Sequence, residues 1–300
     1  MLSFNKNKNP IIDLYDKEDF NDDYKLNKDI TKPNETLYID DKIESDSEDS
    51  DEKDKEDYLY IKNLNNFIPF PHIEKNKLYR FYIFGKSGIG KSTTLCNLIK
   101  MFLNTYDNDI FILYYTANNL DEPIVKYLKK IGNKNIMVIT PQDFYIARLQ
   151  RKILPYSVDY LLSKMKQDKK NRPILCCFDD FETLNDKTIK NLVDNFRDDI
   201  LQRGRKRTSD TNNIHCINIS HTGLQGHQSI KLFNESEYII CHLRSLSNST
   251  IENILKIKCG YDDDIIKIVL DMKRKGAGIT FIKSSYPFII MNDKGILYMK

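Results

Sequence analysis

One short segment limits the possible folds of this 300-residue chain: Gly85-Lys86-Ser87-Gly88-Ile89-Gly90-Lys91-Ser92. It matches the pattern G-x-x-x-x-G-K-[ST], in which a glycine-rich turn cradles phosphate groups. The apolar run Phe81–Phe84 precedes the segment, and residues 93–102 carry apolar side chains at helical spacing after it. A strand, a glycine turn and a helix are the context in which this pattern indicates phosphate binding. We therefore expect a buried strand that delivers the loop to the start of a helix.

Each position of the loop has an expected role toward a nucleotide. Glycines let the backbone curl so that several N–H groups converge on phosphate oxygens, and the helix adds the positive end of its dipole. Lys91 is expected to reach the β- and γ-phosphates of ATP, and the Ser92 hydroxyl is expected to coordinate Mg²⁺. The predicted nucleotide-binding residues are Gly85, Lys86, Ser87, Gly88, Ile89, Gly90, Lys91, Ser92 and Thr93.

A second predicted strand ends in two carboxylates. Residues 174–178 are apolar and run directly into Asp179 and Asp180. Asp179 is expected to hold the Mg²⁺ shell, and Asp180 to polarise the water that attacks the γ-phosphate. The plain alternative is an acidic turn after a strand, where Asp is common. The position of the pair, about 90 residues after the phosphate loop, favours the catalytic interpretation.

The next predicted strand, residues 214–219, is followed by Ser220 and His221. If this strand lies beside the Asp179 strand, Ser220 or His221 faces the γ-phosphate and can sense its loss. A histidine at such a place can instead have a simple capping role. The sequence therefore makes His221 a candidate catalytic residue.

A basic cluster, Arg203 to Arg207, precedes that strand. Such a cluster can be a solvated helix end that complements the helix dipole. In a ring ATPase the same position can deliver an arginine to the neighbouring subunit, where it stabilises charge on the γ-phosphoryl group. Arg205 is the residue we expect to act in this way.

The order of these segments resembles the FtsK/HerA superfamily of P-loop ATPases. Ile214-His215, followed after five intervening residues by His221 and preceded by arginines, is similar to that superfamily's pattern. Arg203-Gly204-Arg205, then Asn218-Ile219-Ser220, and then residues 230–234 resemble blocks of the poxvirus-type genome-packaging ATPases of large DNA viruses. The likeness spans roughly residues 78–245. His221 stands where the family usually has Gln, Lys231 replaces an Arg, and a polar loop separates the arginines from the strand.

The resemblance implies a double-stranded DNA translocase that packages a viral genome into a capsid. ATP hydrolysis would take place at sites shared between the subunits of a homo-oligomeric ring, and capsid or portal proteins would be further partners. It also implies a location in the virion or in the viral assembly compartment of the infected cell. Two alternatives stay open: a small-molecule or nucleotide kinase, for which we find no clear lid, and an ATP-dependent switch protein with little turnover.

From residue 78 onward, apolar strands alternate with amphipathic helices, which predicts an α/β fold. We expect a mainly parallel P-loop NTPase sheet of RecA-like (ASCE) type, flanked by helices on both faces. The expected strands are 79–84, 110–115, 136–140, 174–178, 214–219 and 237–243. The expected helices are 92–104, 121–131, 157–167, 187–202, 249–258 and 263–273, and residues 279–300 are expected to form a terminal β-meander.

Charge divides the chain into an acidic leader and a basic body. Residues 1–57 carry 19 acidic and 9 basic side chains, and the rest carries a net charge of +13. We expect residues 1–57 to form a disordered acidic tail, residues 58–78 to strap onto the core, and residues 79–300 to form the ATPase domain. The tail is either a solvated segment or a polyanion that competes with nucleic acid. The basic body favours a phosphate-rich partner, although lysines also serve solubility.

No apolar run approaches 18 residues and no basic-then-apolar leader is present, so we expect no membrane partner. The six cysteines include no C-x-x-C pair, and several lie in apolar runs. Buried, reduced thiols in a cytosol-like environment are the expected consequence.

Overall fold

The computed structural model divides the chain into two compact units, one of residues 73–238 and one of residues 1–72 together with 239–300. The C-terminal segment, which we expected within the ATPase domain, groups instead with the N-terminal residues. The residues that the structure describes are 2–3, 9–22, 25–39, 58–62, 64, 66–75, 77–117, 123–131, 135–150, 172–181, 184–203, 214–221, 227–285 and 288–299.

The unit of residues 73–238 contains five parallel strands in the order β6-β10-β9-β7-β8. Their bounds are Arg80–Phe84 (β6), Ile214–Ser220 (β10), Ile174–Asp179 (β9), Phe111–Thr116 (β7) and Ile136–Ile139 (β8). The predicted α/β fold with a parallel sheet is confirmed, and the acidic strand β9 pairs with β10, which is the condition under which residues 220 and 221 were expected at the site. One strand, β10, therefore separates the strand that leads into the phosphate loop from the strand that ends in Asp179.

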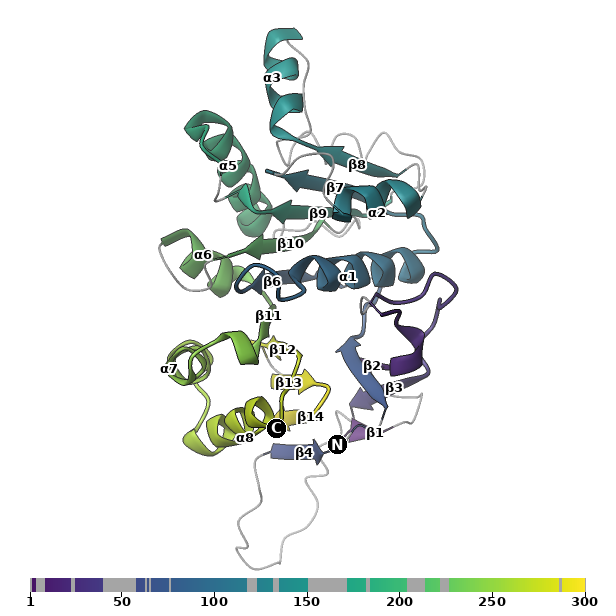
Figure 1. Ribbon diagram of the computed structural model, residues 1–300, viewed down its shortest axis with the longest axis vertical. Coiled ribbons are helices and arrows are strands. Elements are labelled where there is room, and N and C mark those ends of the chain that lie inside the picture. The colour runs from purple at the N-terminus through teal and green to yellow at the C-terminus, as the bar shows by residue number, and fades with distance from the viewer. Residues whose placement is uncertain are drawn as a thin grey trace, which may run out of the picture. The chain divides into compact units, whose positions relative to one another are not determined.

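Helices connect these strands and flank the sheet, except that α3 extends away from the sheet beyond its edge strand β8 (Figure 1). They are α1 (Lys91–Thr105), α2 (Pro123–Ile131), α3 (Pro141–Gln150), α5 (Lys187–Arg203) and α6 (His227–Glu235). Right-handed crossovers that run from β6 toward β8 place α1 and α2 on one face. The crossover from β9 to β10 runs toward β6, opposite in direction to the first two crossovers, and the same handedness therefore places α5 on the opposite face of the sheet.

Two of these helices, α3 and α6, were not predicted from the sequence. A proline at the first position and Asp143 in the first turn start α3, and the Asp143 carboxylate accepts a hydrogen bond from the Thr140 backbone N–H at 2.8 Å. α6 is a nine-residue helix. The helix expected at 157–167 lies outside the described residues.

The core of this unit is dense with aromatic side chains. β6, β9 and β10 are buried along their whole length. At the amino ends of β6 and β10, His215 is fully buried, and its Nδ1 accepts a hydrogen bond from the Tyr79 backbone N–H at 3.3 Å. Its Nε2 lies 3.2 Å from the Tyr106 hydroxyl. His215, part of the family-like pattern, is therefore a core residue at the end of β10 opposite to His221.

The other unit contains an antiparallel sheet of order β1-β3-β2-β5. The expectation of a disordered tail over all of residues 1–57 is therefore wrong for the strands of this sheet that fall within that range. The sheet's strands are Leu2–Ser3 (β1), Glu35–Ile39 (β3), Asn9–Asp16 (β2) and Phe67–Pro71 (β5), with a 3-10 turn η1 at Lys17–Asp19. Ile12, Leu14 and Leu37 are buried there. Apolar side chains placed between the acidic ones bury enough surface to order residues 9–22 and 25–39. Residues 40–57, the most acidic part, lie outside the described residues.

The same unit holds the antiparallel strands β4 (Tyr58–Lys62), β14 (Gly295–Met299), β13 (Phe288–Asn292) and β12 (Ile279–Lys283), followed in sheet order by β11 (Tyr238–His242). The meander expected near the C-terminus is thus present. The remaining elements are η3 (Leu243–Ser245), α7 (Asn248–Glu252), the π-helical segment η4 (Asn253–Lys258) and α8 (Asp263–Arg274).

Across the part of the chain that the structure describes, no helix combines the length and the apolar character needed to traverse a lipid bilayer.

The central position of β10 gives a stability prediction. Ile217 is fully buried in the middle of β10, which pairs on both sides, so Ile217→Ala should lower the free energy of unfolding by about 2–5 kcal/mol. Leu192→Ala, on α5 at a side chain that is 44% exposed, should cost less than about 1 kcal/mol. Urea denaturation of both variants measures the difference, and equal costs would contradict the central placement of β10.

Candidate active site

The phosphate loop between β6 and α1 needs its glycines for their backbone conformation. Gly85, Gly88 and Gly90 have φ values of 143°, 78° and 93°, which side chains strongly disfavour. Gly90 is the residue before α1 and caps that helix without any side-chain hydrogen bond. The backbone N–H groups of the first turn of α1 therefore have no side-chain cap, as a helix that receives an anion requires.

Lys91 folds back over this loop. Its side chain is buried, and its ammonium donates hydrogen bonds to the carbonyl oxygens of Gly85 at 2.7 Å and Lys86 at 3.2 Å. The same Nζ lies 3.0 Å from Nδ1 of His221. The loop lysine is thus held between its own loop and the end of β10.

His221 continues this contact to the acidic pair. Its Nε2 lies 2.8 Å from Oδ2 of Asp180, which is largely buried. His221 therefore bridges Lys91 and Asp180 from its place after β10, between the strands that carry the other two residues. The expected meeting of Lys91, Asp180 and His221 at one edge of the sheet is present in the structure.

Asp179, the last residue of β9, is 3% exposed and accepts a hydrogen bond from the Tyr114 hydroxyl on β7. Burial raises the pKa of Asp179 to about 6, and the adjacent Asp180 carboxylate contributes to this rise. The Tyr114 hydrogen bond and the charge of Lys91 act in the opposite direction. Burial and the Asp179 carboxylate also raise the pKa of Tyr114, so its hydroxyl stays a donor. Tyr114 was not predicted from the sequence, because a tyrosine inside an apolar strand gives no signal of a partner.

The remaining predicted residues have different positions. Lys86, Ser87, Gly88 and Ser92 are exposed on the loop and the first helical turn, whereas Ile89, Gly90 and Thr93 are half-buried. Arg205 lies outside the described residues. Among the residues that are described, no group of three His, Cys, Asp or Glu side chains could hold a metal alone. A carboxylate and a hydroxyl are nevertheless suitable oxygen ligands for Mg²⁺, which commonly completes its shell with water and phosphate oxygens.

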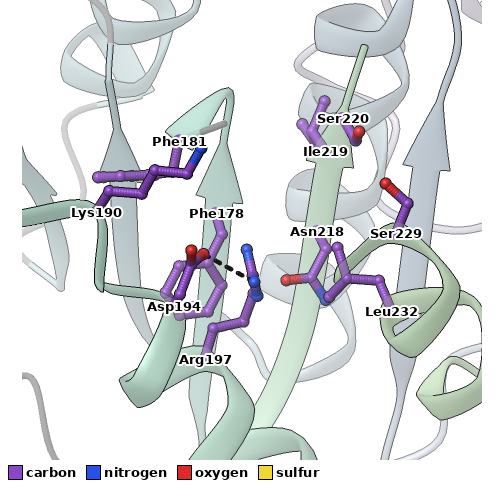
Figure 2. A pocket seen from close by; sticks show the side chains of 10 residues that line it. All are labelled: Phe178, Phe181, Lys190, Asp194, Arg197, Asn218, Ile219, Ser220, Ser229 and Leu232. Atoms are coloured by element: carbon purple, nitrogen blue, oxygen red, sulfur yellow. Dashed lines mark ion pairs between the residues drawn. The ribbon is translucent and has the colours of Figure 1, made fainter. Parts of the chain in front are cut away.

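A small cavity with a mixed polar and apolar lining lies between β10, α5 and α6, with a volume of about 70 Å³ (Figure 2). Arg197 and Asp194 of α5 form an ion pair at 2.8 Å on one side, and Asn218 and Ser220 of β10 line the other side. Ser220 therefore lines this cavity, whereas His221 contacts Lys91. Of the two residues that the sequence proposed as γ-phosphate sensors, His221 is the one that reaches the loop lysine.

No protein-family model matches the chain. It is 26% identical over 250 residues to an uncharacterized protein V3 of the Sputnik virophage, and the alignment covers 82% of this chain and 86% of that protein. Among solved structures, its neighbours include ATPases 2 and 3 of EssC from Geobacillus thermodenitrificans, with 16% identity and a TM-score of 0.42. That match covers 78% of this chain and 40% of the EssC chain.

A second structural neighbour is the genome packaging NTPase B204 of Sulfolobus turreted icosahedral virus 2, in complex with ATPγS. The two chains share 15% identity with a TM-score of 0.36, over 74% of this chain and 97% of B204.

Because the carboxyl group of Asp179 is buried, we predict that the free energy of unfolding of the metal-free protein depends on pH. Between about pH 4 and pH 6 the folded protein holds a proton on Asp179 that the unfolded chain has lost, so raising the pH lowers stability. A pKa difference of roughly two units corresponds to about 3 kcal/mol. Relative to Asp179→Asn, the wild type should lose on the order of 3 kcal/mol between about pH 4 and pH 7. Urea denaturation in a chelator measures this, and parallel stability curves for the two proteins would contradict it.

Proposed function

We propose that this chain hydrolyses ATP at the edge of the sheet where β6, β10 and β9 end. One observation supports the proposal above all others: Lys91, His221 and Asp180 lie in hydrogen-bonding sequence from three adjacent strands. In an ordinary glycine-rich turn, the lysine would contact only the carbonyl oxygens of its own loop. A phosphate cradle, a buried carboxylate and a group near the γ-phosphate are the parts that nucleotide hydrolysis requires.

Each part has a proposed role. Backbone N–H groups from Gly85 to Thr93 surround the phosphates, and the Lys91 ammonium neutralises the β- and γ-phosphate oxygens. Ser92 and Asp179 would hold Mg²⁺, which supplies charge neutralisation at the phosphates when it is bound. The Tyr114 hydroxyl fixes the orientation of the Asp179 carboxylate.

We further propose that hydrolysis drives translocation of double-stranded DNA during packaging of a viral genome. The net charge of +13 on residues 58–300 supports contact with a phosphate backbone, and the similarity to a virophage protein is consistent with a viral role. A homo-oligomeric ring would let Arg205 of one subunit reach the γ-phosphate in the next. Capsid or portal proteins are the proposed further partners, and the virion or its assembly compartment is the proposed location.

Removal of the loop lysine tests the hydrolytic part. Lys91→Ala should reduce ATP hydrolysis by about a hundredfold or more, because the charge that faces the β- and γ-phosphates is lost. Lys126→Ala, on the exposed face of α2, is the matched control and should keep wild-type turnover. Phosphate release from ATP measures both variants. Phosphoryl transfer to an added nucleoside in place of water would show a kinase and contradict the proposal.

The DNA-dependent part has its own test. Duplex DNA should stimulate ATP turnover, and its affinity should fall steeply with salt because binding releases counterions from the phosphates. Fluorescence anisotropy at several salt concentrations gives the affinity, and Lys91→Ala should retain it while it loses turnover. A protein that hydrolyses ATP but neither binds nor responds to duplex DNA at low salt would contradict translocation and leave the ATPase intact.

A further inference from the structure

Two contacts of His221, with Asp180 and with Lys91, indicate which ring nitrogen carries the proton. The Asp180 carboxylate at Nε2 can only accept a hydrogen bond, and the Lys91 ammonium at Nδ1 can only donate one. The imidazole that satisfies both carries its proton on Nε2 and an open lone pair on Nδ1. An imidazolium would instead direct an Nδ1–H toward an ammonium at 3.0 Å, which is repulsive.

This tautomer changes the role expected for His221. A γ-phosphate sensor has to donate a hydrogen bond to phosphate oxygens, which carry no proton of their own. The Nε2–H is committed to Asp180 at 2.8 Å, and Nδ1 has no hydrogen to donate. In this arrangement His221 is an acceptor at the nucleotide, so it is suited to bind a water hydrogen and not a phosphate oxygen.

The position of Nδ1 places this acceptor at the reacting end of the nucleotide. Lys91 is the residue expected to bind the β- and γ-phosphates, and Nδ1 lies 3.0 Å from its Nζ. A triphosphate is a far stronger partner for the ammonium than the Gly85 and Lys86 carbonyls and a neutral imidazole. When Lys91 turns to the phosphates, the Nδ1 lone pair loses its donor and becomes available beside the γ-phosphate.

We propose that His221 is the general base of the ATPase site and that Asp180 is its positioning residue. The proposal rests on the proposed ATP hydrolysis. The water oxygen forms the new bond to Pγ, and the bond from Pγ to the β,γ-bridging oxygen breaks, with its electron pair leaving on ADP. One water proton passes to Nδ1, and the imidazolium that forms is stabilised by the Asp180 carboxylate until the proton is lost to solvent.

The order of rate losses in two variants tests this assignment. In His221→Gln the side-chain amide can still donate to Asp180 near the position of Nε2, but the Nδ1 acceptor is gone. We expect kcat to fall by about 10² to 10⁴, with ATP affinity within about twofold of the wild type. Asp180→Asn keeps an oxygen that accepts from Nε2–H but loses the charge, so a smaller loss of about 10- to 100-fold is expected.

Chemical rescue adds a measurement that a merely structural role would not affect. In His221→Ala the ring is missing, and added imidazole should restore part of the hydrolysis rate in a saturable manner. Retained binding of a fluorescent ATP analogue and an unchanged circular dichroism spectrum show that each variant is folded.

The outcomes separate the two proposals. A wild-type protein that hydrolyses ATP, with a His221→Gln rate within about threefold of it and a larger loss in Asp180→Asn, would make Asp180 itself the group at the water and overturn the assignment. Absence of imidazole rescue in folded His221→Ala that still binds the analogue would also count against it. A wild-type protein that binds ATP without hydrolysing it would overturn the proposed ATPase function, and with it this assignment.

Discussion

The hydrogen-bonded series from Lys91 through His221 to Asp180 is the interaction on which the rest of the site depends. Its two bonds, 3.0 Å and 2.8 Å long, connect an ammonium to a carboxylate through one imidazole. Each partner is partly or fully removed from water, so each needs the other to offset the loss of hydration. The arrangement holds the loop lysine, the ring and the acid in fixed relation before any substrate is present.

The sheet order makes this series possible. Strand β10 pairs with β6 on one side and with β9 on the other, so the residue directly after it stands between the phosphate loop and the acidic pair. On the other face of the same strand, Asn218 and Ser220 line the cavity beside Arg197 (Figure 2). Alternation along β10 and into the residue after it therefore directs His221 toward Lys91, and Asn218 and Ser220 toward the cavity beside α5 and α6.

Much of this fold could be predicted because the five strands of the parallel sheet are continuous apolar runs, and because the loop motif requires a helix directly after β6. The strands within residues 9–39 could not, since Asp13 and Asp16 stand beside the buried Ile12 and Leu14, and residues 1–57 as a whole carry 19 acidic side chains. The sequence of a strand also does not show which strands pair with it. The contact of Tyr114 with Asp179 depends on the pairing of β7 with β9 and could not be predicted for that reason. His221 was predicted at the site, whereas the direction of its hydrogen bonds required the positions of both partners.

The backbone at Asp180 has a consequence for which side chains can stand there. Its φ of 56° lies in the left-handed region, which short polar residues such as aspartate and asparagine tolerate and longer ones adopt at greater cost. A glutamate would gain reach at the expense of backbone strain. Asp180 instead reaches Lys91 through the imidazole of His221, which follows the adjacent strand β10. Asp180 thereby keeps a backbone conformation that a short acidic residue tolerates. Asp180 and His221 together therefore make a connection to Lys91 that a single glutamate at position 180 could make only with a strained backbone.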